Sequence, residues 1–254
     1  KKNYVNNNML VNNSNVARSA LTEFPQNNNE FEAFLQFSSG TTGSKKGVKI
    51  SSEALINQIN GYKPHVQFDN KSTVISWLPH YHDMGLIACM LMPLFEKVPI
   101  VMLSPFEWVS KPVSLLENIQ QYKATHTWQP NFALGHLVKS IPYEEVKNYD
   151  LNSLKKLVCC SEPVLYRTIE KFKQHFAPSN LNPEIIHNCY AMAENTFAMT
   201  VSTNEKLKYL GIDYDVFKND NKVVMKEDNG FLIASAGKPI KNTAIKILSD
   251  KNNK

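Results

Sequence analysis

Short runs of apolar and β-branched residues alternate along most of this chain with longer stretches whose apolar residues recur at helical spacing. Such alternation predicts a mostly parallel sheet, because parallel neighbours need a crossover between them and the crossover helices then cover both faces. We therefore expect the α/β class, with a mostly parallel sheet flanked by helices. The predicted strands are 34–37, 74–77, 98–103, 125–128, 154–160 and 184–188, and the predicted helices lie near 52–62, 85–95, 112–122, 131–140 and 165–176.

The two ends of the chain differ from this central pattern. Residues 1–30 are rich in asparagine and indicate a polar lead-in, whereas the expected strands 231–235 and 244–248 follow each other without a helix. We predict an α/β subdomain over 31–200 and, over 201–254, the start of a β-rich subdomain. The chain does not begin with methionine and ends just after an expected strand, so we expect a piece of a longer protein.

Charge and cysteine content limit the classes of function. The net charge is +5 and the lysines are scattered, which argues against a nucleic-acid partner and suits an anionic small molecule or an acidic protein. The four cysteines form no CxxC pair and have no zinc-like spacing, which is typical of a reduced, cytoplasmic protein. The longest apolar run, 84–95, is too short to span a bilayer, so no transmembrane segment is expected.

One glycine-rich stretch could hold a polyanion. Residues 36–47 read QFSSGTTGSKKG and follow a predicted strand ahead of a predicted helix. Glycines let backbone N–H groups turn toward one point, hydroxyl side chains add donors and Lys46 adds a positive charge, so the stretch can wrap a phosphate chain. It is not a Walker A loop, because Lys45, Lys46 and Gly47 stand where that motif has Gly, Lys and Ser or Thr. The alternative is an ordinary surface turn.

A second stretch, SWLPHYHDMGLI at 76–87, follows a predicted strand and places polar groups at the sheet edge where ligands of such sheets bind. His80, His82 and Asp83 raise the alternative of a metal site. No other cluster of histidine and aspartate supports that alternative, and a binuclear hydrolase motif would need Asp where the chain has Met84.

A third stretch, HNCYAMAENT at 187–196, also ends a predicted strand at that edge. Tyr190 could stack on a base, and the Glu194 carboxylate could hold Mg²⁺. The alternative for Glu194 is a solvated loop carboxylate.

In combination these stretches resemble a known family. SSGTTGSKKGV resembles the phosphate-binding signature of the adenylate-forming enzyme superfamily, and YAMAE, further along the chain, resembles its Tyr-Gly-x-x-Glu motif. Within that superfamily, LQFSSGTTG, SWLPHYHDMGLI, ATHTWQPNFAL, CSEPV and FAPSNLNPEIIHNCYAMAE look like the fatty acyl-AMP ligases. The matches occur in family order over residues 33–250, so the chain resembles the central part of the N-terminal domain of such a ligase.

The resemblance implies ATP-dependent activation of a fatty acid. The fatty-acid carboxylate attacks the α-phosphorus of ATP, which gives acyl-AMP and pyrophosphate, and the acyl group then passes to the phosphopantetheine thiol of an acyl carrier protein. Because an anion attacks a polyanion, the site must neutralise charge and align the reactants more than it must supply acid or base. The implied cofactors are ATP and Mg²⁺, and this fragment is expected to be inactive alone.

The resemblance also assigns roles to individual residues. The catalytic group is Lys46 beside the phosphates, His82 at the carboxylate end of the acyl tunnel and Glu194 as the Mg²⁺ ligand. The loop over the phosphates comprises Ser38, Ser39, Gly40, Thr41, Thr42 and Gly43, and the slot for the base comprises Ser161, Glu162, Pro163, Asn188, Cys189, Tyr190 and Ala191. The acyl tunnel is expected to be lined by Trp128, Phe132 and Met192.

Three departures from the family pattern affect these expectations. Lys45 replaces a proline, which makes the loop less stiff and more basic, and Ser161 replaces an alanine. Ala191 replaces a glycine, and its methyl group would crowd a backbone conformation that glycine reaches easily.

The interval between Glu194 and the turn at 237–239 is long. Fatty acyl-AMP ligases carry an extra segment there, held to restrain the mobile C-terminal domain and to disfavour the CoA reaction, and residues 204–230 would be that segment. Its expected apolar anchors on the N-terminal body are Leu207, Tyr209, Leu210, Ile212, Tyr214 and Phe217. A family-neutral loop insertion, a fatty acyl-CoA synthetase and a non-catalytic nucleotide- or acyl-binding homologue stay open as alternatives.

Overall fold

A computed structural model describes residues 32–37, 46–202, 206–226 and 228–247. Within these residues the main sheet has seven strands in the order β11-β8-β7-β6-β5-β3-β4. The five strands from β4 to β7 are parallel, and β8 and β11 extend the sheet antiparallel. In chain order the strands are β3 (Val74–Ser76), β4 (Ile100–Met102), β5 (His126–Gln129), β6 (Lys156–Cys159), β7 (Ile186–Ala191), β8 (Ala198–Val201) and β11 (Lys238–Pro239).

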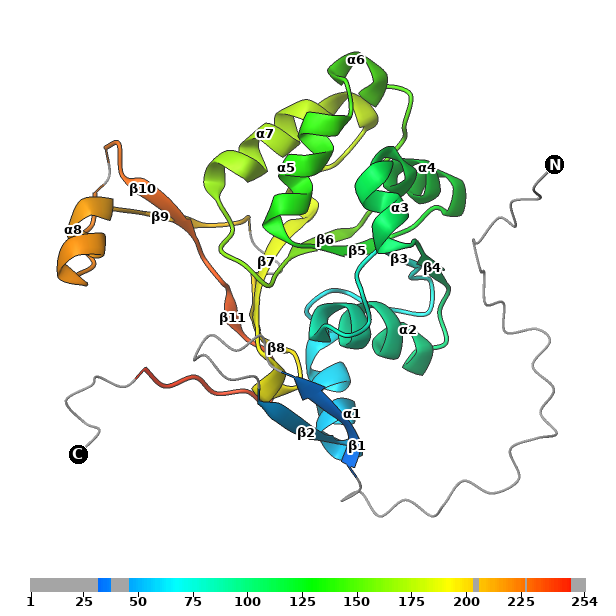
Figure 1. The fold of residues 1–254 in the computed structure, drawn as a ribbon, viewed down its shortest axis with the longest axis horizontal. Coiled ribbons are helices and arrows are strands. Elements are labelled where there is room, and N and C mark those ends of the chain that lie inside the picture. Colours follow the sequence, from blue (N-terminus) through cyan, green and yellow to red (C-terminus); the bar gives the residue numbers. More distant parts are fainter. Residues whose placement is uncertain (1–31, 38–45, 203–205, 227, 248–254) are drawn as a thin grey trace.

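Helices cover both faces of this sheet, as Figure 1 shows. A π-helix, η2 (Met84–Leu91), continues into α2 (Met92–Phe95) and shares one face with α1 (Ser52–Tyr62). The other face carries α3 (Pro105–Ser110), α4 (Val113–Tyr122), α5 (Asn131–Ser140), α6 (Tyr143–Val146) and α7 (Tyr166–Phe176). The predicted α/β class, a mostly parallel sheet flanked by helices, is therefore confirmed.

Local sequence explains where the helices begin and end. The Ser51 hydroxyl caps α1 by accepting from the backbone N–H of Ala54 at 3.1 Å. In α4 the spacing of Leu115, Leu116 and Ile119 puts all three into the core, and Lys123, in the left-handed conformation, ends the helix.

The core lies between the sheet and these helices. Trp128 of β5 and Trp108 of α3 are fully buried, and the indole rings of Trp77 and Trp108 stack with centroids 3.8 Å apart. Ring contacts between Tyr62 and Phe197 tie α1 to the residues just before β8. These large side chains give the parallel strands a continuous apolar layer on each face.

One predicted strand forms but lies outside the main sheet, and another is not a strand in its described residues. The strand expected at 34–37 is part of β1 (Glu32–Phe37), but it pairs antiparallel with β2 (Gly47–Ser51) in a separate two-stranded sheet, because an apolar run alone does not identify its partner. Residues 244–247 of the strand expected at 244–248 have no strand conformation and are mostly exposed.

A second hairpin lies at the margin of the molecule. Strands β9 (Tyr209–Ile212) and β10 (Phe231–Ala234) pair antiparallel, and α8 (Tyr214–Asp220) lies between them in sequence. Figure 1 shows this hairpin projecting to one side of the molecule, beside α7 and β7. No helix among the described residues is long and apolar enough to cross a membrane.

Candidate active site

Three loops approach one another at the carboxyl edge of the parallel strands. The buried Gln36 side chain, at the end of β1, donates from Nε2 to the backbone carbonyl of Tyr81 at 3.1 Å. The Ser161 hydroxyl, beyond β6, lies 3.9 Å from the Met84 sulfur. Stretches 36–47 and 76–87 and the turn at Ser161 therefore belong to one region of the molecule.

The predicted phosphate loop is only partly described. Ser38, Ser39, Gly40, Thr41, Thr42 and Gly43 lie outside the described residues. Both ends of the loop are described, and they are adjacent because Phe37 and Gly47 are register partners in the β1–β2 pair. The loop thus connects two antiparallel strands, whereas a direct strand-to-helix passage was predicted. Lys46, at its end, is exposed.

The His82–Gly85 stretch starts the π-helix η2. The Asp83 carboxylate accepts from the backbone N–H of Met84 at 2.8 Å, and the Leu86 N–H donates to the His82 carbonyl. Only glycine fits at Gly85, since a Cβ there would lie 2.3 Å from the Pro79 carbonyl oxygen. His82, at the start of this stretch, is exposed.

Asp83 links this stretch to Glu194. Burial raises the pKa of the Asp83 carboxyl, the backbone N–H of Met84 and the charge of His82 lower it, and the negative charge of Glu194 raises it further. Sequence reasoning considered Asp83 only as a metal ligand. Its position between two loops could not be predicted from spacing.

The residues after β7 form a tight turn. Glu194 is exposed on a short 3₁₀ helix, η5 (Ala193–Asn195), and Thr196 follows with φ +67°, a left-handed conformation that is rare for a β-branched residue. Ala191 is the last residue of β7 and does not have a positive φ. The expected crowding at Ala191 therefore does not arise.

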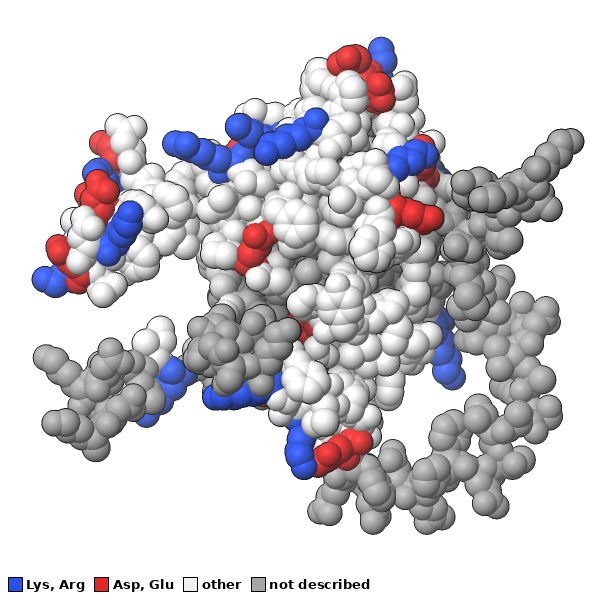
Figure 2. All heavy atoms as spheres, viewed as in Figure 1, with Lys and Arg blue, Asp and Glu red and all other residues white. Residues whose placement is uncertain are grey.

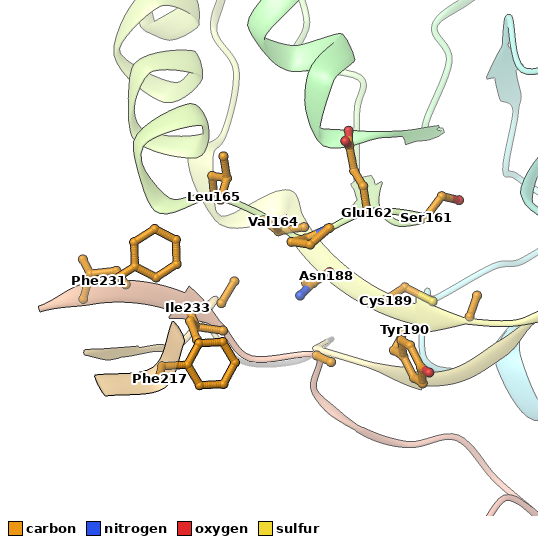
Figure 3. A pocket seen from close by; sticks show the side chains of 15 residues that line it. Ser161, Glu162, Val164, Leu165, Asn188, Cys189, Tyr190, Phe217, Phe231 and Ile233 are labelled. Carbon is orange, nitrogen blue, oxygen red and sulfur yellow. The ribbon is translucent and has the colours of Figure 1, made fainter. Parts of the chain in front are cut away.

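A cavity of about 680 Å³ opens beside this turn (Figure 3). All seven residues predicted for the base slot line it: Ser161, Glu162, Pro163, Asn188, Cys189, Tyr190 and Ala191. Tyr190 is 52% exposed, so a face of its ring is available for stacking. The lining also contains residues that sequence reasoning missed: Val164 and Leu165 next to the turn, and Phe217, Phe231, Leu232, Ile233, Ala234 and Ala236 from the late part of the chain.

Hydrogen bonds fix the turn between β6 and α7. Ser161 has φ +74°. The Glu162 carboxylate accepts from the backbone N–H of Phe132 at the start of α5, and Figure 3 shows this side chain directed away from the cavity. The Leu165 N–H donates to the Asn131 side-chain oxygen at 3.1 Å. The backbone of the turn, rather than the Glu162 carboxylate, therefore faces the cavity.

The three residues predicted for an acyl tunnel are not gathered in one cavity. Trp128 is fully buried in the core and donates from its indole N–H to the Tyr62 hydroxyl at 2.8 Å. Phe132 is 55% exposed and lines a second cavity of about 400 Å³ with Val109, Asn131, Gly135, His136, Lys139 and Thr168. Met192 is half-buried after β7.

The four cysteines, Cys89, Cys159, Cys160 and Cys189, are free and buried. Burial raises the pKa of Cys89 to about 12, so its thiol is neutral at physiological pH. Among the described residues no group of three or more His, Cys, Asp or Glu side chains could by itself hold a metal ion.

A parallel sheet whose carboxyl edge carries an aromatic residue, an exposed carboxylate and a cavity defines an α/β protein with a candidate nucleotide site. The sequence profile of the AMP-binding enzyme family matches residues 3–254. The chain belongs to this family.

Known relatives agree with the resemblance to fatty acyl-AMP ligases. The chain is 29% identical over 239 residues to the medium-chain-fatty-acid–[acyl-carrier-protein] ligase JamA of Moorena producens, covering 92% of this chain and 40% of that protein. It is 34% identical over 170 residues to the long-chain-fatty-acid–AMP ligase FadD26 of Mycobacterium marinum, covering 65% of this chain and 29% of that protein. The chain thus spans less than half the length of these relatives.

A solved structure gives the same result. The fatty acyl-adenylate ligase of Legionella pneumophila, in complex with acyl adenylate and pyrophosphate, superposes with a TM-score of 0.76 at 35% identity and covers 81% of this chain and 37% of that one.

Proposed function

We propose that the protein activates a fatty acid with ATP, forming acyl-AMP and releasing pyrophosphate, and passes the acyl group to an acyl carrier protein. The observation that carries this proposal is the cavity at the sheet edge, which is lined by all seven residues expected to hold the base. The family match and the acyl-adenylate ligase structure support the same chemistry.

The site residues act mainly on charge and position. Tyr190 stacks on the adenine and the turn from Ser161 to Pro163 presents its backbone to it. The loop from Ser38 to Gly43, with Lys46 at its end, neutralises the phosphates, and His82 stands at the carboxylate end of the acyl chain. The attack of a carboxylate on a polyanion is accelerated chiefly by such neutralisation and alignment.

Mg²⁺ fits the donor set of this edge. The ion prefers oxygen ligands and is commonly held by one or two carboxylates together with substrate phosphates. Glu194 offers an exposed carboxylate, and Asp83 is close enough for the charge of Glu194 to raise its pKa. When bound, the ion would neutralise charge on the phosphates, and Glu194 would be its principal protein ligand.

The acyl chain occupies the region near Phe132. This side chain is more than half exposed and lines the second cavity, which is separated from the first by the turn whose Glu162 carboxylate accepts from the Phe132 N–H. Trp128 supports the tunnel from within the core, and Met192 lines it near the base. Burying apolar surface of the fatty acid supplies the binding free energy.

The acceptor is an acyl carrier protein rather than CoA. The names of JamA and of TtuA of Teredinibacter turnerae specify acyl-carrier-protein ligases. A fatty acyl-CoA synthetase is the second candidate, because the chain is also 29% identical to FadD25 of Mycobacterium tuberculosis, whose name is a putative fatty-acid–CoA ligase. The free thiols support a reducing compartment such as the cytoplasm.

The segment 204–230 restrains the mobile C-terminal domain of the full-length protein. Leu207 and Tyr209 pack against the main core, and Ile212 is buried, as expected of anchors. Leu210, Tyr214 and Phe217 are more than 40% exposed, so they do not serve as anchors on the described body. Three apolar side chains remain to hold the segment in place.

The test uses the full-length protein with ATP, Mg²⁺ and a panel of fatty acids, with and without CoA and carrier protein. We expect pyrophosphate release that depends on the fatty acid, and acyl-carrier product in excess of acyl-CoA. Acyl-CoA as the main product would favour the synthetase. Absence of pyrophosphate with every acid would favour a non-catalytic homologue and overturn the proposal.

A further inference from the structure

One wall of the nucleotide cavity is supplied by a part of the chain that carries none of the family motifs. Figure 3 shows Ile233 of β10 and Phe217 of α8 across the cavity from Val164 and Leu165, with Asn188 between the two sides. We call residues 209–226 and 228–234, which comprise β9, α8 and β10, the wall segment.

The wall segment is attached to both other sides of the cavity. Ile233 makes an antiparallel bridge with Leu165, and the Asn188 side-chain N–H donates to the Ser235 carbonyl at 3.0 Å. On its outer side the Tyr209 ring meets the Tyr166 ring edge-on, with centroids 4.9 Å apart. Two of these contacts hold the wall segment against the start of α7, and the bond to Ser235, immediately after β10, holds it beside β7, so together they set the width of the cavity.

The side chains that the wall segment presents to the cavity are large, apolar and unusually open to solvent. Phe217 is 41% exposed, Phe231 42% and Ile233 39%. The polar groups of the lining lie away from these side chains, on the backbone of the turn from Ser161 to Pro163 and on Asn188. An apolar face opposite a few polar groups is the usual composition of a small-molecule pocket, and it suits a flat base whose faces are apolar and whose edge is polar.

We propose that Phe217 and Ile233 contact the base of the bound adenine nucleotide, so that the wall segment is part of the nucleotide site. The inference rests on the proposed function, because it requires the cavity to hold ATP. It adds that occupation of the cavity covers apolar surface of the wall segment and holds the segment in place. ATP binding and the position of the segment are then linked.

The experiment measures ATP binding by calorimetry in the full-length protein without fatty acid, so that no turnover occurs. Phe217→Ala and Ile233→Ala should each raise the Kd for ATP about fivefold or more, because each removes apolar contact with the base. Val223→Ala is the matched control: Val223 lies in the same segment, is 62% exposed and does not line the cavity, so its Kd should equal that of the parent. A thermal scan of each variant shows that it is folded.

A second measurement needs no variant. Backbone hydrogen exchange in residues 209–226 and 228–234 of the parent protein should slow on addition of ATP. If Phe217→Ala and Ile233→Ala bind ATP within twofold of the parent and exchange in the wall segment is unchanged, the inference is overturned while the proposed function stands. If the parent binds no ATP, both are overturned.

Discussion

Two lysines near the phosphate loop differ in what they contact. Lys49 pairs with Glu32 across the β1–β2 sheet, whereas Lys46 forms no ion pair with another residue of the described chain. In the full-length protein, Lys46→Ala should lower the rate of pyrophosphate release by about 10²-fold, as loss of one charge-stabilising group typically does. Lys49→Ala is the control and should stay near the parent rate. A rate for Lys46→Ala within threefold of the parent would remove Lys46 from the site.

The Glu194 carboxylate allows a similar comparison. Glu194→Gln keeps the shape of the side chain and removes its charge, so the Mg²⁺ concentration needed for half-maximal rate should rise. Glu184→Gln, at the opposite end of β7 and exposed, is the control. An unchanged Mg²⁺ titration for Glu194→Gln at full rate would show that Glu194 is a plain loop carboxylate.

The role of a residue could be predicted only where the residue belongs to a recognisable motif. Tyr190 and Asn188 belong to a contiguous stretch that follows a strand, and both line the cavity. Phe217 and Ile233 carry no local signal, since an exposed apolar residue in a hairpin looks the same whether or not it faces a ligand. Phe132 was expected near Trp128, but their adjacent elements direct one side chain to the surface and the other into the core.

At the scale of elements, the start of the π-helix depends on the absence of a side chain. Gly85→Ala would place a Cβ 2.3 Å from the Pro79 carbonyl oxygen, so the free energy of unfolding should fall by about 1–3 kcal/mol. Gly135→Ala in α5 is the matched variant: its Cβ would meet only the Thr168 methyl group at 4.0 Å, and stability should be equal or higher by up to about 1 kcal/mol. Equal stabilities in urea would contradict the packing described at Gly85.

Two buried histidines make the sheet sensitive to acid. Burial, together with the charges of nearby lysines, lowers the pKa of His126 on β5 and of His187 on β7 to about 4. His187 accepts from the Lys156 ammonium at 3.1 Å through Nε2 and donates from Nδ1 to the Ser202 carbonyl at 2.9 Å, which requires a neutral ring.

The sign of the pH effect follows from these lowered pKa values. Above about pH 6.5 both rings are neutral whether folded or unfolded, and below it the unfolded chain binds protons that the folded chain does not. The free energy of unfolding should therefore fall as pH drops from about 7 toward 4, by up to about 3 kcal/mol for each histidine. Urea titrations between about pH 7 and 5, compared with His187→Asn, check this. An equal slope in parent and variant would contradict it.

Most elements of the sheet were predictable, because buried parallel strands separated by amphipathic helices leave a clear periodic pattern. Helix α1 was placed at its observed bounds, and α4 within one residue. Strand β2 was not predicted because GVKIS is short and half polar. Strand β8 was not predicted because its residues follow almost directly on the stretch 187–196, which was interpreted as a strand end and a loop. Strand β1 pairs with a strand on the far side of a glycine-rich loop, and composition alone does not identify that partner.

At the scale of the whole molecule, we expect the anchoring of the wall segment to limit the movement of the C-terminal domain in the full-length protein. The Tyr209 ring packs against the core and against Tyr166, but its buried hydroxyl has no hydrogen-bond partner among the residues that the structure describes. In the full-length protein, Tyr209→Ala should loosen the segment and raise acyl-CoA formation, since a restraint worth a few kcal/mol shifts a domain equilibrium strongly.

Tyr209→Phe is the matched control for that prediction. It keeps the ring and removes the unpaired hydroxyl, so the protein should be equally or more stable and acyl-CoA formation should not change. If Tyr209→Ala folds, forms acyl-AMP and makes no more acyl-CoA than Tyr209→Phe, the segment is not the restraint. Point variants are preferable to removal of residues 204–230, which would leave β10 without its partner strand.

The hydrogen bonds around the Ser161 turn also couple the movement of this turn to that of α5. Glu162 accepts from Phe132, and Leu165 donates to Asn131, so the turn and the first residues of α5 hold each other at two points. The turn borders one cavity and α5 borders the other. Two hydrogen bonds remove the rotation that a single bond would allow. The turn and the start of α5 must therefore move together as one unit. Widening either cavity on this side moves the shared partition between them and changes the width of its neighbour.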